Sequence, residues 1–232
     1  LRFLYDQLSN REGDIRRKSA ETMGILIAKY RNPVTKMLPT RVVSDMDDSM
    51  QVWRAYLSRI VYPGHRVTDQ HRSWIRYTLK LVTRSLYSNV EEERLHDFIA
   101  VFLELFSEED LTERAAFAMI EAVVNVPRNI YNDDELITIA ENLLRFSNAQ
   151  SVEDKASVLS TVDKLLMLDE RSDELNAVLE RILDNLEAFV SDAATEYLYK
   201  KSRSNLSGSN ESGAEIIESI CSKYGDPTPK LM

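Results

Sequence analysis

Residues 114–121 read Arg-Ala-Ala-Phe-Ala-Met-Ile-Glu, a basic residue followed by apolar side chains at helical spacing. Phe117 comes three positions after the arginine and Ile120 six positions after it, so both side chains lie on one face of a helix. Three further segments repeat this pattern, and they begin at Arg17, Arg72 and Lys155.

In all four segments a small or apolar residue lies three positions after the basic residue, and another lies six or seven positions after it. In the other three segments these residues are Ala20 with Met23 and Gly24, Ile75 with Leu79, and Val158 with Val162. The basic residues lie 55, 42 and 41 positions apart. The last two intervals match the period of ~40–47 residues expected for HEAT or armadillo units. We attribute the longer first interval to a connection over residues 32–49, which contains Pro33, Pro39 and three aspartates.

Each repeated helix requires a partner helix before it. The apolar pattern places these partners at residues 1–9, 50–61, 91–106 and 133–146, and places later helices at 172–190 and 192–201. Only six glycines and six prolines occur, which argues against many short strands. The sequence therefore predicts an all-α fold, a right-handed α-solenoid of about five HEAT-type helical hairpins.

Composition changes toward the C-terminus. We expect the helical repeat domain to cover residues 1–201, and residues 202–213, rich in Ser, Asn and Gly, to form a flexible linker. A short helix and an extended tail should follow over residues 214–232.

Charge is distributed unevenly along the chain. Residues 1–84 contain 16 Lys and Arg against 8 Asp and Glu, and residues 85–232 contain 13 against 30. The single cysteine, Cys221, excludes an internal disulfide and favours an intracellular, reducing compartment. No apolar run approaches the ~18 residues of a membrane span, so we expect no membrane partner.

Sequence signatures of catalysis are missing. The chain has no Gly-rich phosphate loop, no Cys-x-x-Cys and no His-Glu-x-x-His, and its histidines are His65, His71 and His96. We expect no enzymatic activity, no cofactor and no metal, and we interpret Cys221 as an inert thiol.

A basic face is the main candidate for binding. Arg72, Arg76 and Lys80 recur every four residues on one helix, and Arg54 and Arg59 lie on the helix before it. This face could contact nucleic acid or an acidic peptide. The alternative is a solvated face whose cations pair with acids of the same domain. Trp53 and Trp74 fall at core-like spacing, so we expect both to pack between hairpins.

Residues 1–85 resemble successive HEAT hairpins of the cohesin-associated Pds5 proteins. The resemblance rests on a helix that ends in Leu8-Ser9, a helix with Arg17, Ala20 and Gly24, and a helix with Trp53. It implies a nuclear scaffold that holds a peptide segment of a ring-forming complex, and it carries over no catalytic residue.

These observations favour a non-enzymatic scaffold that binds a protein subunit or extended peptide in a chromosome-associated assembly. A second hypothesis is a nucleic-acid-binding HEAT module that uses the N-terminal basic face. Related scaffolds in RNA processing, nuclear transport or microtubule regulation have the same pattern.

Overall fold

The computed structural model describes residues 1–29, 48–61, 69–109, 111–124, 126–147, 152–168, 171–190, 192–209 and 212–224. Within these ranges every regular element is a helix and none is a strand, so the predicted all-α class is confirmed there. The connection expected over residues 32–49 lies outside the described residues, apart from its last two positions, which begin a helix.

The helices form two compact units, Leu1–Tyr131 and Asn132–Met232. The boundary between these units falls inside the repeat domain that we expected over residues 1–201. Each unit contains its own set of buried apolar side chains.

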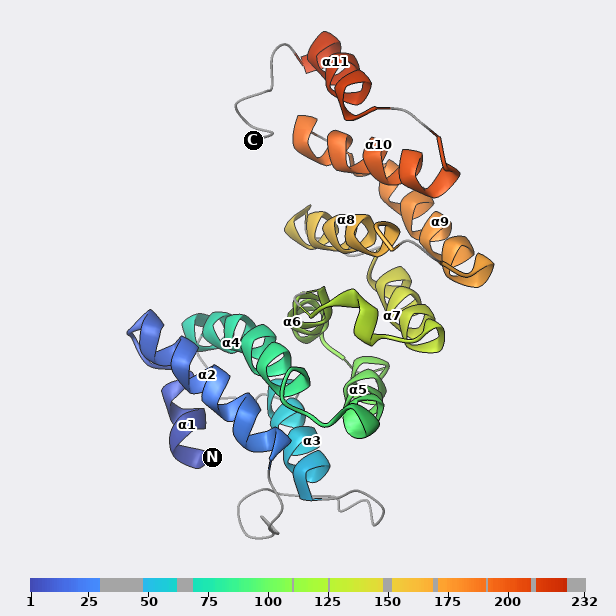
Figure 1. Cartoon of the computed structure of the whole chain (residues 1–232). Helices are drawn as coiled ribbons and strands as arrows, with labels where there is room; N and C mark the ends of the chain where they lie inside the picture. Colours follow the sequence, from blue (N-terminus) through green and yellow to red (C-terminus); the bar gives the residue numbers. More distant parts are fainter. Residues whose placement is uncertain are drawn as a thin grey trace. The chain divides into compact units, whose positions relative to one another are not determined.

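In the first unit, most described helices pack against the helix two positions further along the chain (Figure 1). Helix α2 packs against α4 and α4 against α6, while α3 packs against α5 and α1 against α2. The bounds are α1 (Arg2–Gln7), α2 (Gly13–Ala28), α3 (Asp48–Val61), α4 (Asp69–Tyr87), α5 (Glu92–Phe106) and α6 (Glu113–Val124), with a 3-10 turn at Arg128–Ile130. The predicted repeat segments thus lie on α2, α4 and α6, and their predicted partners on α1, α3 and α5.

Trp53 lies at the centre of the aromatic core of this unit and is fully buried. Its ring stacks against Tyr56 and Phe102 at centroid distances of 5.8 and 6.3 Å, and meets Tyr87 edge-on. The indole Nε1 donates a hydrogen bond to the carbonyl oxygen of Phe98 at 3.1 Å, which satisfies the one polar atom of the buried ring. These contacts join α3 to α5, as core-like spacing predicted.

Helices α2 and α4 lie very close to each other at Gly24 of α2. A Cβ atom at this position would lie 2.6 Å from the carbonyl oxygen of Val82, 2.7 Å from the amide nitrogen of Leu86 and 2.7 Å from Cβ of Ser85. The Ser85 hydroxyl donates a hydrogen bond to the carbonyl oxygen of Glu21 at 2.6 Å, so the two helices also share a polar contact. Glycine at this position is therefore what permits α2 to lie directly on α4.

The second unit has the same kind of pairing. Helix α7 packs against α9, α8 against α10, and α10 also against α9 and α11. The bounds are α7 (Asp133–Phe146), α8 (Val152–Leu166), α9 (Asp173–Glu187), α10 (Ala193–Ser207) and α11 (Gly213–Tyr224). The predicted helices at 133–146 and 172–190 correspond to α7 and α9, and the last predicted helix corresponds to α11.

Local side-chain contacts fix several helix ends in this unit. Asn132 and Glu135 form a reciprocal capping box at the start of α7. The guanidinium of Arg171 donates to the carbonyl oxygens of Leu166 and Leu168 at the end of α8 and to that of Asn205 in α10. Arg171 therefore satisfies carbonyl groups that a helix C-terminus leaves open.

Helix α10 differs from the linker expected over residues 202–213. The helix continues to Ser207 and ends at Gly208, whose φ of 65° is the left-handed conformation that glycine adopts readily. Ser202 and Ser204 are buried, so these serines act as small side chains in a helix that packs against α8 and α9. Composition alone indicated a linker because serine is common in both settings.

We expect Gly24→Ala to destabilise the first unit by about 1–3 kcal/mol, because the new methyl group would meet backbone atoms of α4 that cannot rotate away. This loss exceeds the gain of about 1 kcal/mol in helix propensity. Urea unfolding followed by tryptophan fluorescence measures the effect, since both tryptophans lie in the first unit.

Gly13→Ala provides the matched control. A Cβ atom at Gly13 would have its nearest neighbour, a guanidinium nitrogen of Arg16, at 3.6 Å, which is ordinary contact. We expect this substitution to leave stability unchanged or to raise it by about 0.4–1 kcal/mol. Equal effects at both glycines would contradict the contact argued for Gly24.

Candidate protein-binding surface

Arg54, the first of the five predicted basic-face residues, forms an ion pair inside the first unit. Its guanidinium forms two hydrogen bonds with the carboxylate of Glu104 in α5, one from each terminal nitrogen, and the Nη2–Oε1 bond is 2.8 Å long. The hydrogen bond from Arg54 lowers the pKa of Glu104, and the same bond raises the pKa of Arg54. Arg54 thus links α3 to α5, as the alternative of internally paired cations predicted.

Arg59 also faces a group of its own unit. Its guanidinium carbon lies 4.9 Å from the ring centroid of Tyr5 in α1, a cation–π contact. Burial raises the pKa of the Tyr5 hydroxyl, while Arg59 acts in the opposite direction. Arg59 therefore helps to hold α1 on α3.

The other three predicted residues lie on α4. Arg72 and Arg76 fall within the helix, but their side chains lie outside the described part of the structure. The ammonium group of Lys80 lies 4.9 Å from the ring centroid of Tyr77, one turn earlier, and Tyr77 is 40% exposed. Lys80 and Tyr77 together form a basic and aromatic pair at the surface.

Three consecutive cations near the start of α2, residues 16–18, have different surroundings. The guanidinium carbon of Arg16 lies 4.9 Å from the ring centroid of Trp74, and its Nη1 donates to the carbonyl oxygens of Asn10 and Arg11. Arg17 forms an ion pair with Asp14 at 3.2 Å. Lys18 is exposed. Trp74 is only partly buried, beneath Arg16, whereas Trp53 is fully buried.

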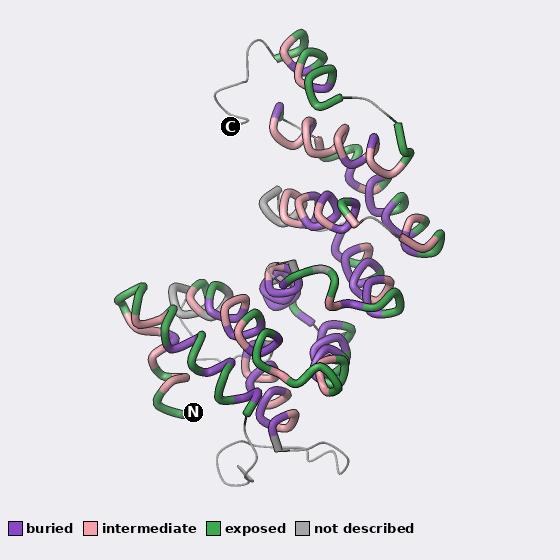
Figure 2. The backbone as a smooth tube through the Cα atoms, viewed as in Figure 1, coloured by how far each residue is buried: buried purple, intermediate pink, exposed green. Residues whose placement is uncertain are grey.

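Helices α2 and α4 are direct neighbours, because the two backbones touch at Gly24. On α4, Val82 and Leu86 are buried and lie at the contact with α2. The other side of this helix carries Tyr77 and Arg84, which are exposed, and Lys80, which is partly exposed. On α2 the exposed positions include Lys18, Ile25 and Lys29. We call these six residues the α2–α4 surface. Figure 2 shows exposed and buried positions alternating along α2.

Cations dominate the α2–α4 surface. Lys18, Lys29 and Arg84 form no ion pair with any described residue. The nearby acids are Asp14, which is paired with Arg17, and Glu21. Ile25, at 36% exposure, and Tyr77 place apolar area among these positive charges. Such a surface can pair with carboxylates and bury an apolar side chain at the same time.

Sequence reasoning missed two kinds of residue on this surface. Arg84 continues the four-residue series of Arg76 and Lys80, so periodicity could have found it. Ile25 and Lys29 had no such signal, because their exposure depends on the side of α2 that α4 covers.

Among the described residues, no group of three or more His, Cys, Asp or Glu side chains could hold a metal ion. Cys221 is a free, partly buried thiol in α11. None of the helices that the structure describes has the length and apolar content of a membrane span.

Comparisons with known proteins identify no relative from sequence: no family model matches the chain, and no curated protein matches it. A search of solved structures finds three chains that match. One of them is the crystal structure of an engineered protein, which is 9% identical and has a TM-score of 0.46. That match covers 98% of this chain and 91% of the other. Similarity at this TM-score establishes neither a fold family nor a function.

We expect the Arg54–Glu104 pair to contribute to stability and not to binding. In a double-mutant cycle of Arg54→Gln and Glu104→Gln, the coupling free energy should be about 0.5–1 kcal/mol, because both side chains are partly exposed to solvent. The pKa of Glu104 is lowered in the folded chain, so the coupling should be present above pH 4.5, its ordinary value, and be lost as the pH falls below it.

Urea unfolding followed by tryptophan fluorescence at pH 7 and pH 3 measures this coupling. Asp97→Asn, an exposed position beyond the first turn of the same helix, is the matched control and should leave stability nearly unchanged. A coupling free energy of zero at pH 7 would show that Arg54 is available to a partner after all.

Proposed function

We propose that this chain is a non-enzymatic scaffold of HEAT-type helical hairpins, which binds an extended segment of a protein partner on the α2–α4 surface. The observation that carries this proposal is the composition of that surface. It combines the exposed apolar side chains Ile25 and Tyr77 with the cations Lys18, Lys29 and Arg84, which form no ion pair with a described residue.

The packing within each unit supports the HEAT-type part of the proposal. Helices two positions apart in the chain pack against each other, as α2 does on α4 and α7 on α9. Stacked hairpins require this arrangement, because each hairpin buries its apolar side against the next one. The number of hairpins and the handedness of the stack remain part of the proposal.

The contacts of two arginines favour a protein partner over nucleic acid. Arg54 is paired with Glu104, and Arg59 lies over Tyr5, so both contribute to packing between helices of the first unit. Two of the five residues predicted to meet phosphate groups are therefore already engaged within the unit. A chromosome-associated, nuclear setting rests on the resemblance of residues 1–85 to cohesin-associated HEAT proteins.

We expect Lys80→Glu combined with Arg84→Glu to weaken partner binding about tenfold or more. The double variant replaces two attractive charge pairs by repulsive ones, and a tenfold loss of affinity corresponds to only about 1.4 kcal/mol. The unfolding midpoint should fall only slightly, because Lys80→Glu loses the cation–π contact with Tyr77 and Arg84→Glu reverses a favourable charge in the last turn of α4. The full-length chain and its variants are immobilised and incubated with nuclear extract. Quantitative mass spectrometry then compares the proteins that each one retains. Isolated candidates are then titrated.

Arg181→Glu is the matched control, because Arg181 is an exposed cation in the second unit. This variant should bind the partner as tightly as the unmodified chain does. A titration in rising salt with a DNA duplex as competitor separates the two classes of partner. Equal retention by all variants would refute the site. Displacement of the protein partner by DNA, with an affinity that falls with salt as about the 0.9 power per neutralised phosphate, would favour the nucleic-acid hypothesis.

A further inference from the structure

Helix α11 meets the second unit through one narrow apolar contact. Of its twelve residues only Ile216 and Ile220, one turn apart, are buried. They form a cluster with Ala193 of α10, and Tyr197 of α10 packs against it. The remaining positions of α11 are exposed or intermediate (Figure 2).

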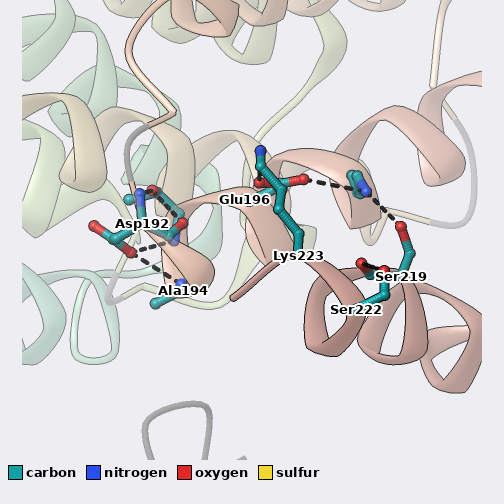
Figure 3. A network of polar contacts seen from close by, with 8 residues as sticks. Asp192, Ala194, Glu196, Ser219, Ser222 and Lys223 are labelled. Carbon is teal, nitrogen blue, oxygen red and sulfur yellow. Dashed lines mark hydrogen bonds and ion pairs between the residues drawn. The ribbon is translucent and has the colours of Figure 1, made fainter. Parts of the chain in front are cut away.

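The C-terminal end of α11 forms an ion pair with a buried carboxylate of α10. Glu196 is only 6% exposed, and its Oε2 accepts a hydrogen bond from the ammonium group of Lys223 at 2.7 Å (Figure 3). Its other oxygen lies 3.2 Å from the ammonium group of Lys200, which also donates to the hydroxyl of Ser219 in α11. The hydrogen bond from Lys223 is the largest cause of the lowered pKa of Glu196.

This carboxylate makes the contact selective for a helix that carries a cation. A buried charge that loses a partner is costly, because the protein interior solvates it poorly. Lys200 of α10 meets one carboxylate oxygen, so a helix lying here is favoured when it presents a positive group to the other oxygen of Glu196 and apolar side chains to Ala193 and Tyr197. Helix α11 meets both requirements with residues spaced at i, i+4 and i+7: Ile216, Ile220 and Lys223.

Helix α11 has little else to hold it in place. Helix α10 ends at Gly208, so α11 is not its continuation. A capping box of Ser212 and Glu215 starts α11 locally. A helix of this length is marginal in water by itself, so its order depends on the contact with α10. Segments with few buried apolar contacts open without global unfolding.

We propose that Ala193, Glu196, Tyr197 and Lys200 of α10 form a helix-docking site, which α11 occupies in this chain and which binds a helix of a second protein when α11 is released. The partner helix presents two aliphatic residues one turn apart and a lysine one turn further on. This site lies in the second unit and does not depend on the function proposed for the α2–α4 surface.

Hydrogen exchange on the full-length chain tests whether α11 opens separately. The amides of residues 213–224 should exchange faster than those of α8 and α9. Glu196→Gln removes the charge that Lys223 meets, and should speed exchange of α11 about tenfold while α8 and α9 keep their protection. Glu218→Gln, at an exposed position of α11, is the matched control and should change nothing. Exchange of α11 only together with the rest of the unit would overturn the proposal.

Binding in trans tests the docking site itself. The full-length double variant Ile216→Asp and Ile220→Asp cannot dock its own α11, so its site on α10 should be open. A fluorescein-labelled peptide with the sequence of residues 212–224 should bind this variant at least tenfold more tightly than the unmodified chain, in which α11 competes. The same peptide with Lys223→Glu should lose that binding. Fluorescence anisotropy measures both.

Two results would refute the docking site. One is equal binding of the peptide to the double variant and to the unmodified chain. The other is loss of hydrogen-exchange protection in α8 and α9 of the double variant, which would make α11 an integral part of the unit rather than a replaceable occupant.

Discussion

The backbones of α2 and α4 touch at Gly24, where one added carbon atom would lie 2.6 Å from the carbonyl oxygen of Val82. This contact sets the distance between two helices that α3 separates in the sequence. It makes α2 and α4 direct neighbours, and Arg16 of α2 lies over Trp74 of α4. The α2–α4 surface therefore depends on the absence of a side chain at one position.

Ion pairing decides which cations of the first unit a partner can reach. Arg54 and Arg84 have the same charge and lie on neighbouring helices in the sequence, but Glu104 lies opposite Arg54 and no described acid pairs with Arg84. A paired guanidinium contributes to folding, and an unpaired one remains available for recognition. Of the basic face that the sequence indicates, Arg54 and Arg59 are thus engaged within the unit, and Arg84, which the sequence analysis did not include, is exposed on α4.

The second unit uses polar groups differently. Glu196 is buried, and cations from α10 and α11 meet it, so a charge and two isoleucines together hold α11. Buried serines in α10 allow close packing in a stretch whose composition is typical of linkers. In both cases a polar residue acquires a structural role from the neighbouring helix.

Sequence by itself determined the helices, because a period of 3.6 residues is a local property: α2, α4 and α6 lie where the repeated basic and apolar segments placed them. It also identified Trp53 as core and Gly24 as part of the repeat. Only the tertiary structure decided that Arg54 is paired, that Ser202 is buried in a helix, and which side of α2 remains exposed. Each of these depends on atoms of another helix, and no spacing within one segment contains that information.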